Sequence, residues 1–139
     1  MIKVGIIGCG AIALKHAKIL KESFVQDMSL VSVCDNNNKR AKKFAEEFEV
    51  SSYNNFHEMM KNEDIDLVSV LTHSGSHANI VIELAKYKKD IIVEKPIALT
   101  MNDALKMIRA CDENGIRLFV VKQNRYNLPI KMLKEEISK

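Results

Sequence analysis

Residues 2–13 read IKVGIIGCGAIA, an apolar run that meets two glycines and then a helical pattern. The run before Gly8 predicts a buried strand, and the residues after Gly10 predict a helix. A strand, a glycine turn and a helix in this order match the G-x-G-x-x-A pattern of dinucleotide-binding turns. In that pattern Gly8 permits the tight turn, Gly10 lets the backbone approach a pyrophosphate, and Ala13 keeps the helix close to the sheet. A purely structural turn is the alternative.

The rest of the chain alternates short β-branched runs with longer helical patterns. We expect strands over 2–7, 30–34, 51–53, 65–71, 91–93 and 117–121, and helices over 11–21, 39–48, 56–61, 78–86, 101–114 and 130–137. Ser76 is expected to cap the fourth helix, and Thr100 with Asp103 the fifth. Strands that are apolar on both faces and joined by helices predict an α/β fold with a doubly wound, Rossmann-type parallel sheet.

Composition limits the classes of protein to which the chain can belong. Its 139 residues, 47% of them hydrophobic, suit one globular domain. The net charge of +3 comes from lysines scattered along amphipathic segments, which argues against a nucleic-acid or membrane partner. No run approaches the ~20 apolar residues of a membrane span, and no signal peptide is evident. The three cysteines, Cys9, Cys34 and Cys111, are odd in number and have no metal-ligand spacing. We therefore expect reduced thiols in a cytoplasmic protein and no metal site.

Asp35 ends the expected second strand and is followed by Asn36. An acidic residue at that place accepts hydrogen bonds from an adenosine ribose and repels a 2′-phosphate, which favours NAD over NADP. Lys39 and Arg40 follow closely and weaken this preference. The structural alternative is an aspartate that only supports a turn or caps a helix.

Residues 72–77 read THSGSH and join the fourth strand to its helix. In an open parallel sheet such a loop lies at the ligand crevice. His73 and His77 either contact cofactor or substrate or serve the local structure. Neither has a cysteine or paired carboxylate nearby, which argues against zinc.

Glu94, Lys95 and Pro96 directly follow the apolar run at residues 91–93. A buried lysine without a purpose costs several kcal/mol, so we expect Lys95 to be aimed into the crevice as a catalytic group. There it donates a hydrogen bond to a substrate oxygen or passes a proton, while Glu94 holds its orientation. A structural salt bridge is the alternative.

Together, the glycine turn, Asp35, the loop at residues 72–77 and the stretch Glu94-Lys95-Pro96-Ile97-Ala98 resemble the nucleotide-binding half of the Gfo/Idh/MocA oxidoreductases. The resemblance covers nearly the whole chain. It implies NAD as the cofactor, Lys95 as the catalytic lysine and a cis bond before Pro96. One departure is His73, where family members usually have proline. The residues expected at the cofactor are Gly8, Gly10, Ala11, Ile12, Ala13, Asp35, Asn36, Thr72, His73, His77, Glu94 and Gln123.

Residues 121–127, VKQNRYN, are similar to the UDP-N-acetylglucosaminuronate 3-dehydrogenases of surface-polysaccharide (lipopolysaccharide) biosynthesis. This resemblance implies hydride transfer between a nucleotide-sugar carbinol carbon and nicotinamide, with Lys95 and Arg125 at the substrate. Family enzymes continue into a second domain that supplies most of the substrate pocket. We therefore expect a Rossmann domain at 1–127 and a crossover helix at 128–139 that leads toward such a domain.

These expectations leave the activity of the chain itself open. Without the second domain it is expected to bind NAD and turn over little, and to self-associate through exposed apolar surface. The alternative is a truncated or free-standing, non-catalytic module that binds a dinucleotide or a partner. A further alternative is a methyltransferase that uses S-adenosylmethionine, which would share the glycine turn. That function would not explain the presence of Lys95-Pro96.

Overall fold

The structure, a computed structural model, describes residues 1–22 and 27–138. The strands are β1 (Ile2–Ile7), β2 (Met28–Cys34), β3 (Ser51–Tyr53), β4 (Leu67–Val70), β5 (Asp90–Val93) and β6 (Leu118–Val120). The helices are α1 (Ala11–Lys21), α2 (Asn38–Phe48), α3 (Phe56–Asn62), α4 (His77–Ala85), α5 (Met101–Glu113) and α6 (Leu128–Ile137), with 3₁₀ turns η1 (Ser74–Ser76) and η2 (Gln123–Tyr126).

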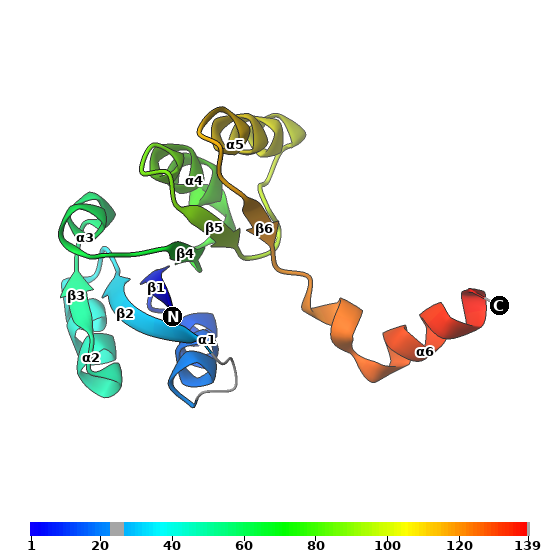
Figure 1. Cartoon of the computed structure of the whole chain (residues 1–139), viewed down its shortest axis with the longest axis horizontal. Coiled ribbons are helices and arrows are strands. Elements are labelled where there is room, and N and C mark those ends of the chain that lie inside the picture. Colours follow the sequence, from blue (N-terminus) through cyan, green and yellow to red (C-terminus); the bar gives the residue numbers. More distant parts are fainter. Residues whose placement is uncertain (23–26, 139) are drawn as a thin grey trace.

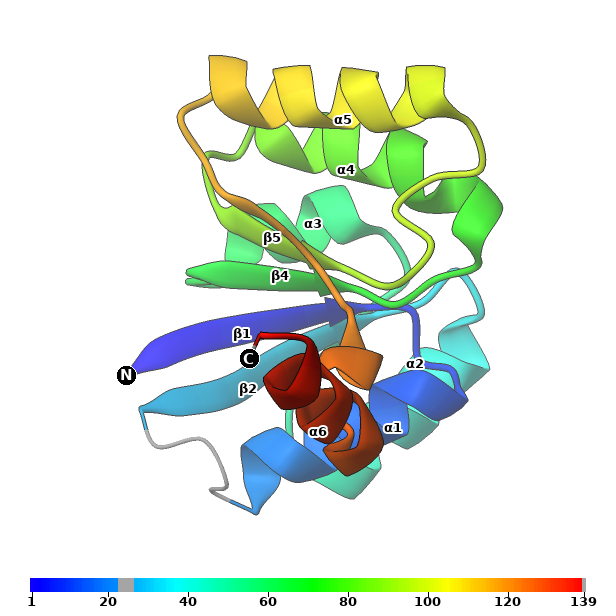
Figure 2. The same cartoon turned by 90° about the vertical axis from the view of Figure 1, so that its right-hand side faces the viewer.

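All six strands are parallel and lie in the order β3-β2-β1-β4-β5-β6. Figure 2 shows α4 and α5 over one face of this sheet, with α1 and α2 over the other. Because helices cover both faces, the central strands bury residues on both sides, and Ile6, Val68 and Ile91 are fully buried. The predicted Rossmann-type α/β fold is confirmed.

The strand order reverses between β1 and β4, and ligands bind at such a switch point, outside the carboxyl ends of the strands. Backbone hydrogen bonds align these ends: Gly8 donates to Cys34 (2.7 Å), Leu71 to Ile7 (2.8 Å) and Glu94 to Val70 (3.0 Å). The segments that follow β1, β2, β4 and β5 therefore start from a common edge. These segments carry the glycine turn, Asp35, the loop at residues 72–77 and the pair Glu94 and Lys95.

Some expected boundaries differ from the structure. The strand expected at 65–71 is shorter, since Ile65 and Leu71 are buried but lie outside β4. Ser76 does not cap α4 with its side chain. The preceding 3₁₀ turn brings its hydroxyl to the carbonyl oxygen of His73, to which it donates at 2.8 Å. The cap at Thr100 is confirmed, because its hydroxyl oxygen accepts from the Asp103 amide at 3.1 Å.

Helix α6 projects away from the sheet and its covering helices (Figure 1). Every residue of α6 is exposed. Its large exposed apolar side chains are Leu128, Ile130, Met132, Leu133 and Ile137. No helix in the described part of the chain is both long and apolar enough to cross a membrane.

Candidate functional site

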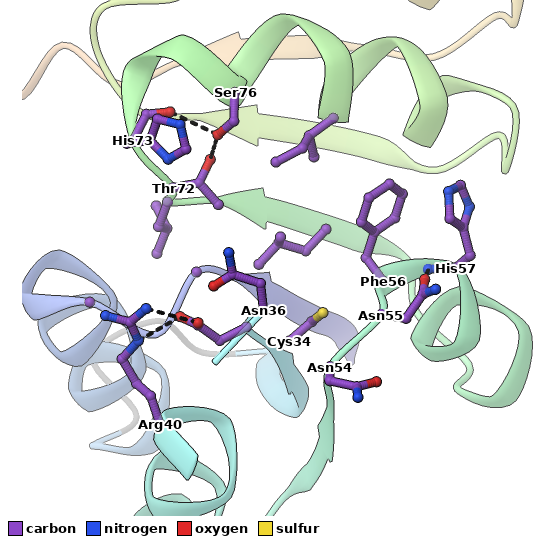
Figure 3. Close-up of a pocket in the computed structure, with 16 residues that line it drawn as sticks. Cys34, Asn36, Arg40, Asn54, Asn55, Phe56, His57, Thr72, His73 and Ser76 are labelled. Atoms are coloured by element: carbon purple, nitrogen blue, oxygen red, sulfur yellow. Dashed lines mark hydrogen bonds and ion pairs between the residues drawn. The ribbon is translucent and has the colours of Figure 1, made fainter. Parts of the chain in front are cut away.

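A cleft of about 580 Å³ opens at the carboxyl edge of the sheet (Figure 3), within the usual range for small-molecule sites. It lies where the segments after β1, β2, β3 and β4 converge. Of the residues expected at a cofactor, it brings together Gly8, Gly10, Asp35, Asn36, Thr72 and His73. The rest of its lining is Ile7, Cys34, Arg40, Asn54, Asn55, Phe56, His57, Leu71, Ser76 and Ile80.

The glycine turn has one residue fixed by packing and one that faces open space. Gly8 has a φ of +96°, and a Cβ there would lie 2.8 Å from the backbone of Leu71. A Cβ on Gly10 would meet nothing within 4 Å. Gly10 directly precedes α1, whose first amides are free of helical partners and suit an anion. The turn is thus open on the side from which a pyrophosphate would approach.

Asp35 stands at the end of β2 and is only 6% exposed. Its Oδ2 accepts from the Cys9 amide (2.9 Å) and its Oδ1 from the Asn37 amide (2.8 Å). Arg40 reaches across from α2 (Figure 3), with Nε 2.9 Å from Oδ2 and Nη2 donating to Oδ1 at 3.0 Å. Burial raises the pKa of Asp35, but the two amides and the guanidinium outweigh it and hold the pKa below its ordinary value. The carboxylate is therefore charged at neutral pH.

The loop after β4 is held by its own side chains. Thr72 and Ser76 share a 2.8 Å hydrogen bond between their hydroxyls, and both line the cleft. His73 is exposed and lines the cleft too. His77 lies beneath the loop: it is 1% exposed, with Nδ1 2.9 Å from the Pro96 carbonyl oxygen and Nε2 3.1 Å from that of Thr72. The structure thus places His77 as a support of two loops, outside the cleft lining.

Sequence reasoning missed the wall formed by the segment after β3. Asn54, Asn55, Phe56 and His57 line the cleft from there. Asn55 also caps α3, since its side chain accepts from the His57 amide at 2.8 Å. The rule that carboxyl ends of strands face the ligand applies to β3 as well, and it pointed to these residues.

Of the charged pair that follows β5, Glu94 takes the buried position at 7% exposure, and Lys95 is exposed. Glu94 Oε2 accepts from the backbone amide of Lys95 (2.9 Å), and Oε1 lies 3.6 Å from His16 Nε2. Burial lowers the pKa of His16, and the charge of Glu94 opposes that shift. The Lys95–Pro96 bond is cis, as the resemblance implied. Glu94 therefore holds the backbone at residue 95, and Lys95 itself is exposed.

The remaining expected residues lie outside the cleft lining. Ala13 is fully buried between α1 and the sheet, and Ile12 is exposed. Ala11 lines a neighbouring groove that adjoins Gly10. Gln123 and Arg125 lie on η2, exposed, on the way to α6.

The GFO_IDH_MocA family model, described as an oxidoreductase family with an NAD-binding Rossmann fold, matches residues 2–122. Among curated proteins, the myo-inositol 2-dehydrogenase of Thermotoga maritima is 31% identical over 136 residues, which are 97% of this chain and 40% of that protein. The inositol 2-dehydrogenase of Salmonella typhimurium is 29% identical over 119 residues, 84% of this chain and 35% of that protein. The chain therefore spans about two fifths or less of the length of these relatives.

Solved structures agree with this match. The WlbA dehydrogenase from Bordetella pertussis, in complex with NADH and UDP-GlcNAcA, has a TM-score of 0.94 and 32% identity. That alignment covers 99% of this chain and 42% of the other. The WlbA dehydrogenase from Chromobacterium violaceum, with the same two ligands, has a TM-score of 0.93 and 33% identity, covering 99% and 39%.

Proposed function

The chain belongs to the Gfo/Idh/MocA oxidoreductases as an NAD-binding Rossmann domain, and we propose that it holds NAD(H) for hydride transfer at a sugar carbinol carbon. One observation carries the proposal: the open side of Gly10, at the start of α1, shares a cleft with the charged Asp35. These are the two groups that a pyrophosphate and an adenosine ribose require. A turn with a purely structural role would require neither an open side at Gly10 nor a charged Asp35 in a cleft large enough for a ligand.

We assign the parts of the dinucleotide to residues by chemistry. The pyrophosphate is held by the turn at Gly8 and Gly10 and by the amides at Ala11 and Ile12. The ribose hydroxyls go to Asp35, with Asn36 beside it. The adenine lies in the part of the cleft that is lined by residues 54–57 and Ile80. Thr72 and His73 line the cleft on the β4 side.

At the other end of the cofactor, Glu94 and Lys95 would serve the reacting atoms. Bound NAD⁺ supplies the hydride acceptor. Glu94 fixes the backbone of the loop, and the Lys95 ammonium donates a hydrogen bond to the substrate hydroxyl and orients it. The proton of that hydroxyl passes to a base that the whole protein supplies.

We propose a UDP-linked sugar acid as the substrate, in surface-polysaccharide synthesis in the cytoplasm. The likeness to two dehydrogenases crystallised with NADH and UDP-GlcNAcA supports this choice. The stretch at residues 121–127 supports it too, with Gln123 beside the nicotinamide and Arg125 at the sugar. The described cysteines are free, as suits a cytoplasmic protein.

The exposure of Lys95 favours little or no turnover by residues 1–139 alone. A lysine in open solvent does not hold a substrate in line with a cofactor. We propose 1–127 as the nucleotide-binding unit and 128–139 as the crossover helix. The exposed apolar side chains of α6 would then support self-association, which light scattering would detect as a mass above that of one chain. The same exposure of Lys95 keeps a non-catalytic dinucleotide-binding module as the second candidate.

Calorimetric titration of the chain with NADH and with S-adenosylmethionine tests the proposal. We expect saturable binding of NADH and none of S-adenosylmethionine; the reverse result would overturn the assignment. A second measurement mixes the chain with NAD⁺ and UDP-sugars and follows NADH absorbance. Rapid NADH formation there would mean that residues 1–139 turn over substrate unaided.

A further inference from the structure

Two histidines from opposite helix layers contact the loop that carries Lys95. His77 is the first residue of α4, and His16 lies in α1. These two helices cover opposite faces of the sheet (Figure 2). The loop at residues 94–96 directly follows β5, and each histidine contacts a different residue of it. The loop is therefore held from both sides of the sheet.

His77 ties this loop to the loop after β4. Its buried ring lies with Nδ1 2.9 Å from the carbonyl oxygen of Pro96 and with Nε2 3.1 Å from that of Thr72. A neutral imidazole donates through one of its two nitrogens, and a doubly protonated ring donates through both. Because the ring is buried, water competes little with these contacts. The ring therefore fixes the spacing between the two loops.

His16 reaches the same loop through Glu94. The Glu94 carboxylate is buried, with Oε1 3.6 Å from His16 Nε2 and Oε2 accepting from the backbone amide of Lys95 at 2.9 Å. A buried carboxylate needs hydrogen-bonding or charged partners, and the His16 ring is one of them. His16 thereby orients the group that holds the backbone of Lys95.

Neither histidine lines the nucleotide cleft in the described part of the chain. Each acts on a residue that has a place in the proposed site: Thr72 lines the cleft, and Lys95 is assigned to the substrate hydroxyl. Because Lys95 is exposed, the backbone at residue 95 decides the direction in which its side chain leaves the loop. The two rings therefore control how Lys95 is presented without touching it.

We propose that His16 and His77 are positioning residues, which together set the backbone at residues 94–96 and so the half of the site that receives the nicotinamide. The inference rests on the proposed function, since that function places the reacting end of NAD(H) beside Lys95. The adenosine half, at Asp35 and the glycine turn, depends on neither ring.

The first test compares NADH with ADP, which keeps the adenosine and the pyrophosphate and lacks the nicotinamide riboside. Calorimetry measures both affinities of the 139-residue chain, in the wild type and in His77→Phe, which keeps a ring and removes its nitrogens. We expect NADH affinity to fall by about tenfold, as for two lost hydrogen bonds, and ADP affinity to change by less than about twofold. His77→Gln returns N–H donors to this place and should bind NADH more tightly than His77→Phe does.

The second test needs no nucleotide. Hydrogen exchange of the Lys95 amide, followed by NMR, reports on its bond to Glu94. His16→Leu removes the imidazole beside Oε1, and we expect the Lys95 amide to exchange about threefold faster or more, the effect of one weakened hydrogen bond. The amides of β4 should exchange at the wild-type rate. The His16 side chain is 26% exposed, so His16→Leu also repeats the NADH and ADP comparison should His77→Phe fail to fold.

Phe48→Leu is the matched control for a general loss of stability. Its ring packs on Phe44, with centroids 4.9 Å apart, in a core cluster that includes no residue of the 94–96 loop. It should lower the unfolding midpoint and leave the ratio of NADH to ADP affinity unchanged. Circular dichroism verifies that each variant is folded.

The failing results are distinct. Equal losses of NADH and ADP affinity in His77→Phe overturn the inference, because the ring would then only support the fold, and so does an unchanged NADH affinity. A wild-type exchange rate of the Lys95 amide in His16→Leu overturns the role of His16. These results leave NADH binding by the wild type, and with it the proposed function, standing. A wild type that binds neither nucleotide overturns the proposed function and the inference with it.

Discussion

Gly8 and Leu71 meet so closely that no side chain fits between them. A Cβ on Gly8 would stand 2.8 Å from both the carbonyl carbon and the carbonyl oxygen of Leu71. Gly8 also has a φ of +96°, a region that residues with a Cβ rarely adopt. The turn after β1 and the end of β4 therefore come together at the switch point only because residue 8 is glycine.

Gly8→Ala should lower the stability of the domain. Both the backbone conformation and the contact with Leu71 penalise a Cβ, and a strained residue of this kind costs about 1–3 kcal/mol. Thermal unfolding followed by circular dichroism should show a lower midpoint. A midpoint equal to that of the wild type would mean that the turn relaxes without cost.

Gly10→Val should leave stability nearly unchanged and weaken NADH binding. Its side chain would enter open space, and Gly10 has a φ of −85°, which any residue adopts. We expect an unfolding midpoint close to that of the wild type and at least about tenfold weaker NADH binding, since the side chain occupies the approach of the pyrophosphate. Undiminished affinity would show that the pyrophosphate lies elsewhere.

Asp35→Asn should weaken NADH binding by about tenfold to 100-fold, the range expected when hydrogen bonds to a charged acceptor are lost. Calorimetry measures the affinity. Asp90→Asn is the matched control, because Asp90 also pairs with an arginine, Arg117, but lies at the start of β5, away from the cleft lining. Equal losses in both variants would argue for a general effect on folding.

The charge of Asp35 should also make stability depend on pH. Its pKa in the folded chain is lowered by the Cys9 and Asn37 amides and by Arg40, against the opposing effect of burial. A lowered folded pKa stabilises the fold above the unfolded value of about 3.9, and this stabilisation is lost as pH falls through the folded pKa. The gap in unfolding midpoint between wild type and Asp35→Asn should therefore be present at pH 7 and shrink below about pH 4. A gap that stays constant with pH would mean that the shape of the Asp35 side chain, and not its charge, causes the difference in stability.

Cys9 and Cys34 should resist alkylation in the folded chain. Burial and the charge of Asp35 raise the pKa of each thiol to about 12. The thiolate fraction near neutral pH is then on the order of a thousandfold below that of a free cysteine. Mass spectrometry after iodoacetamide treatment should find both unmodified until denaturant is added. Rapid labelling of Cys9 in the native chain would show that the glycine turn opens.

Sequence patterns predicted the parts of the site that depend on local rules. The turn from Gly8 to Gly10 follows from strand, glycine and helix signals, and Asp35 follows from its place at the end of β2. The cap at Thr100 has a fixed spacing to Asp103, and the structure confirms it. Each of these features is decided by residues a few positions apart.

The features that sequence patterns did not predict depend on the course of the chain in three dimensions. The sequence placed Glu94 and Lys95 together after a buried strand, but it did not show that Glu94 is the buried member of the pair. Ser76 lies where a cap belongs, yet a 3₁₀ turn leads its hydroxyl to His73. The pairing of Arg40 with Asp35 joins a helix to a strand end, and residue spacing alone does not reveal it.

Because α6 is exposed, we expect proteases to cut the chain there first. An isolated helix of 10 residues is short of the roughly 12–15 that remain helical in water, and α6 buries none of its residues against the domain. Its amide protons should exchange with solvent long before those of β1 and β4. Trypsin should then cut first at Lys131 and Lys134, trimming the chain toward a resistant core that still carries the nucleotide cleft.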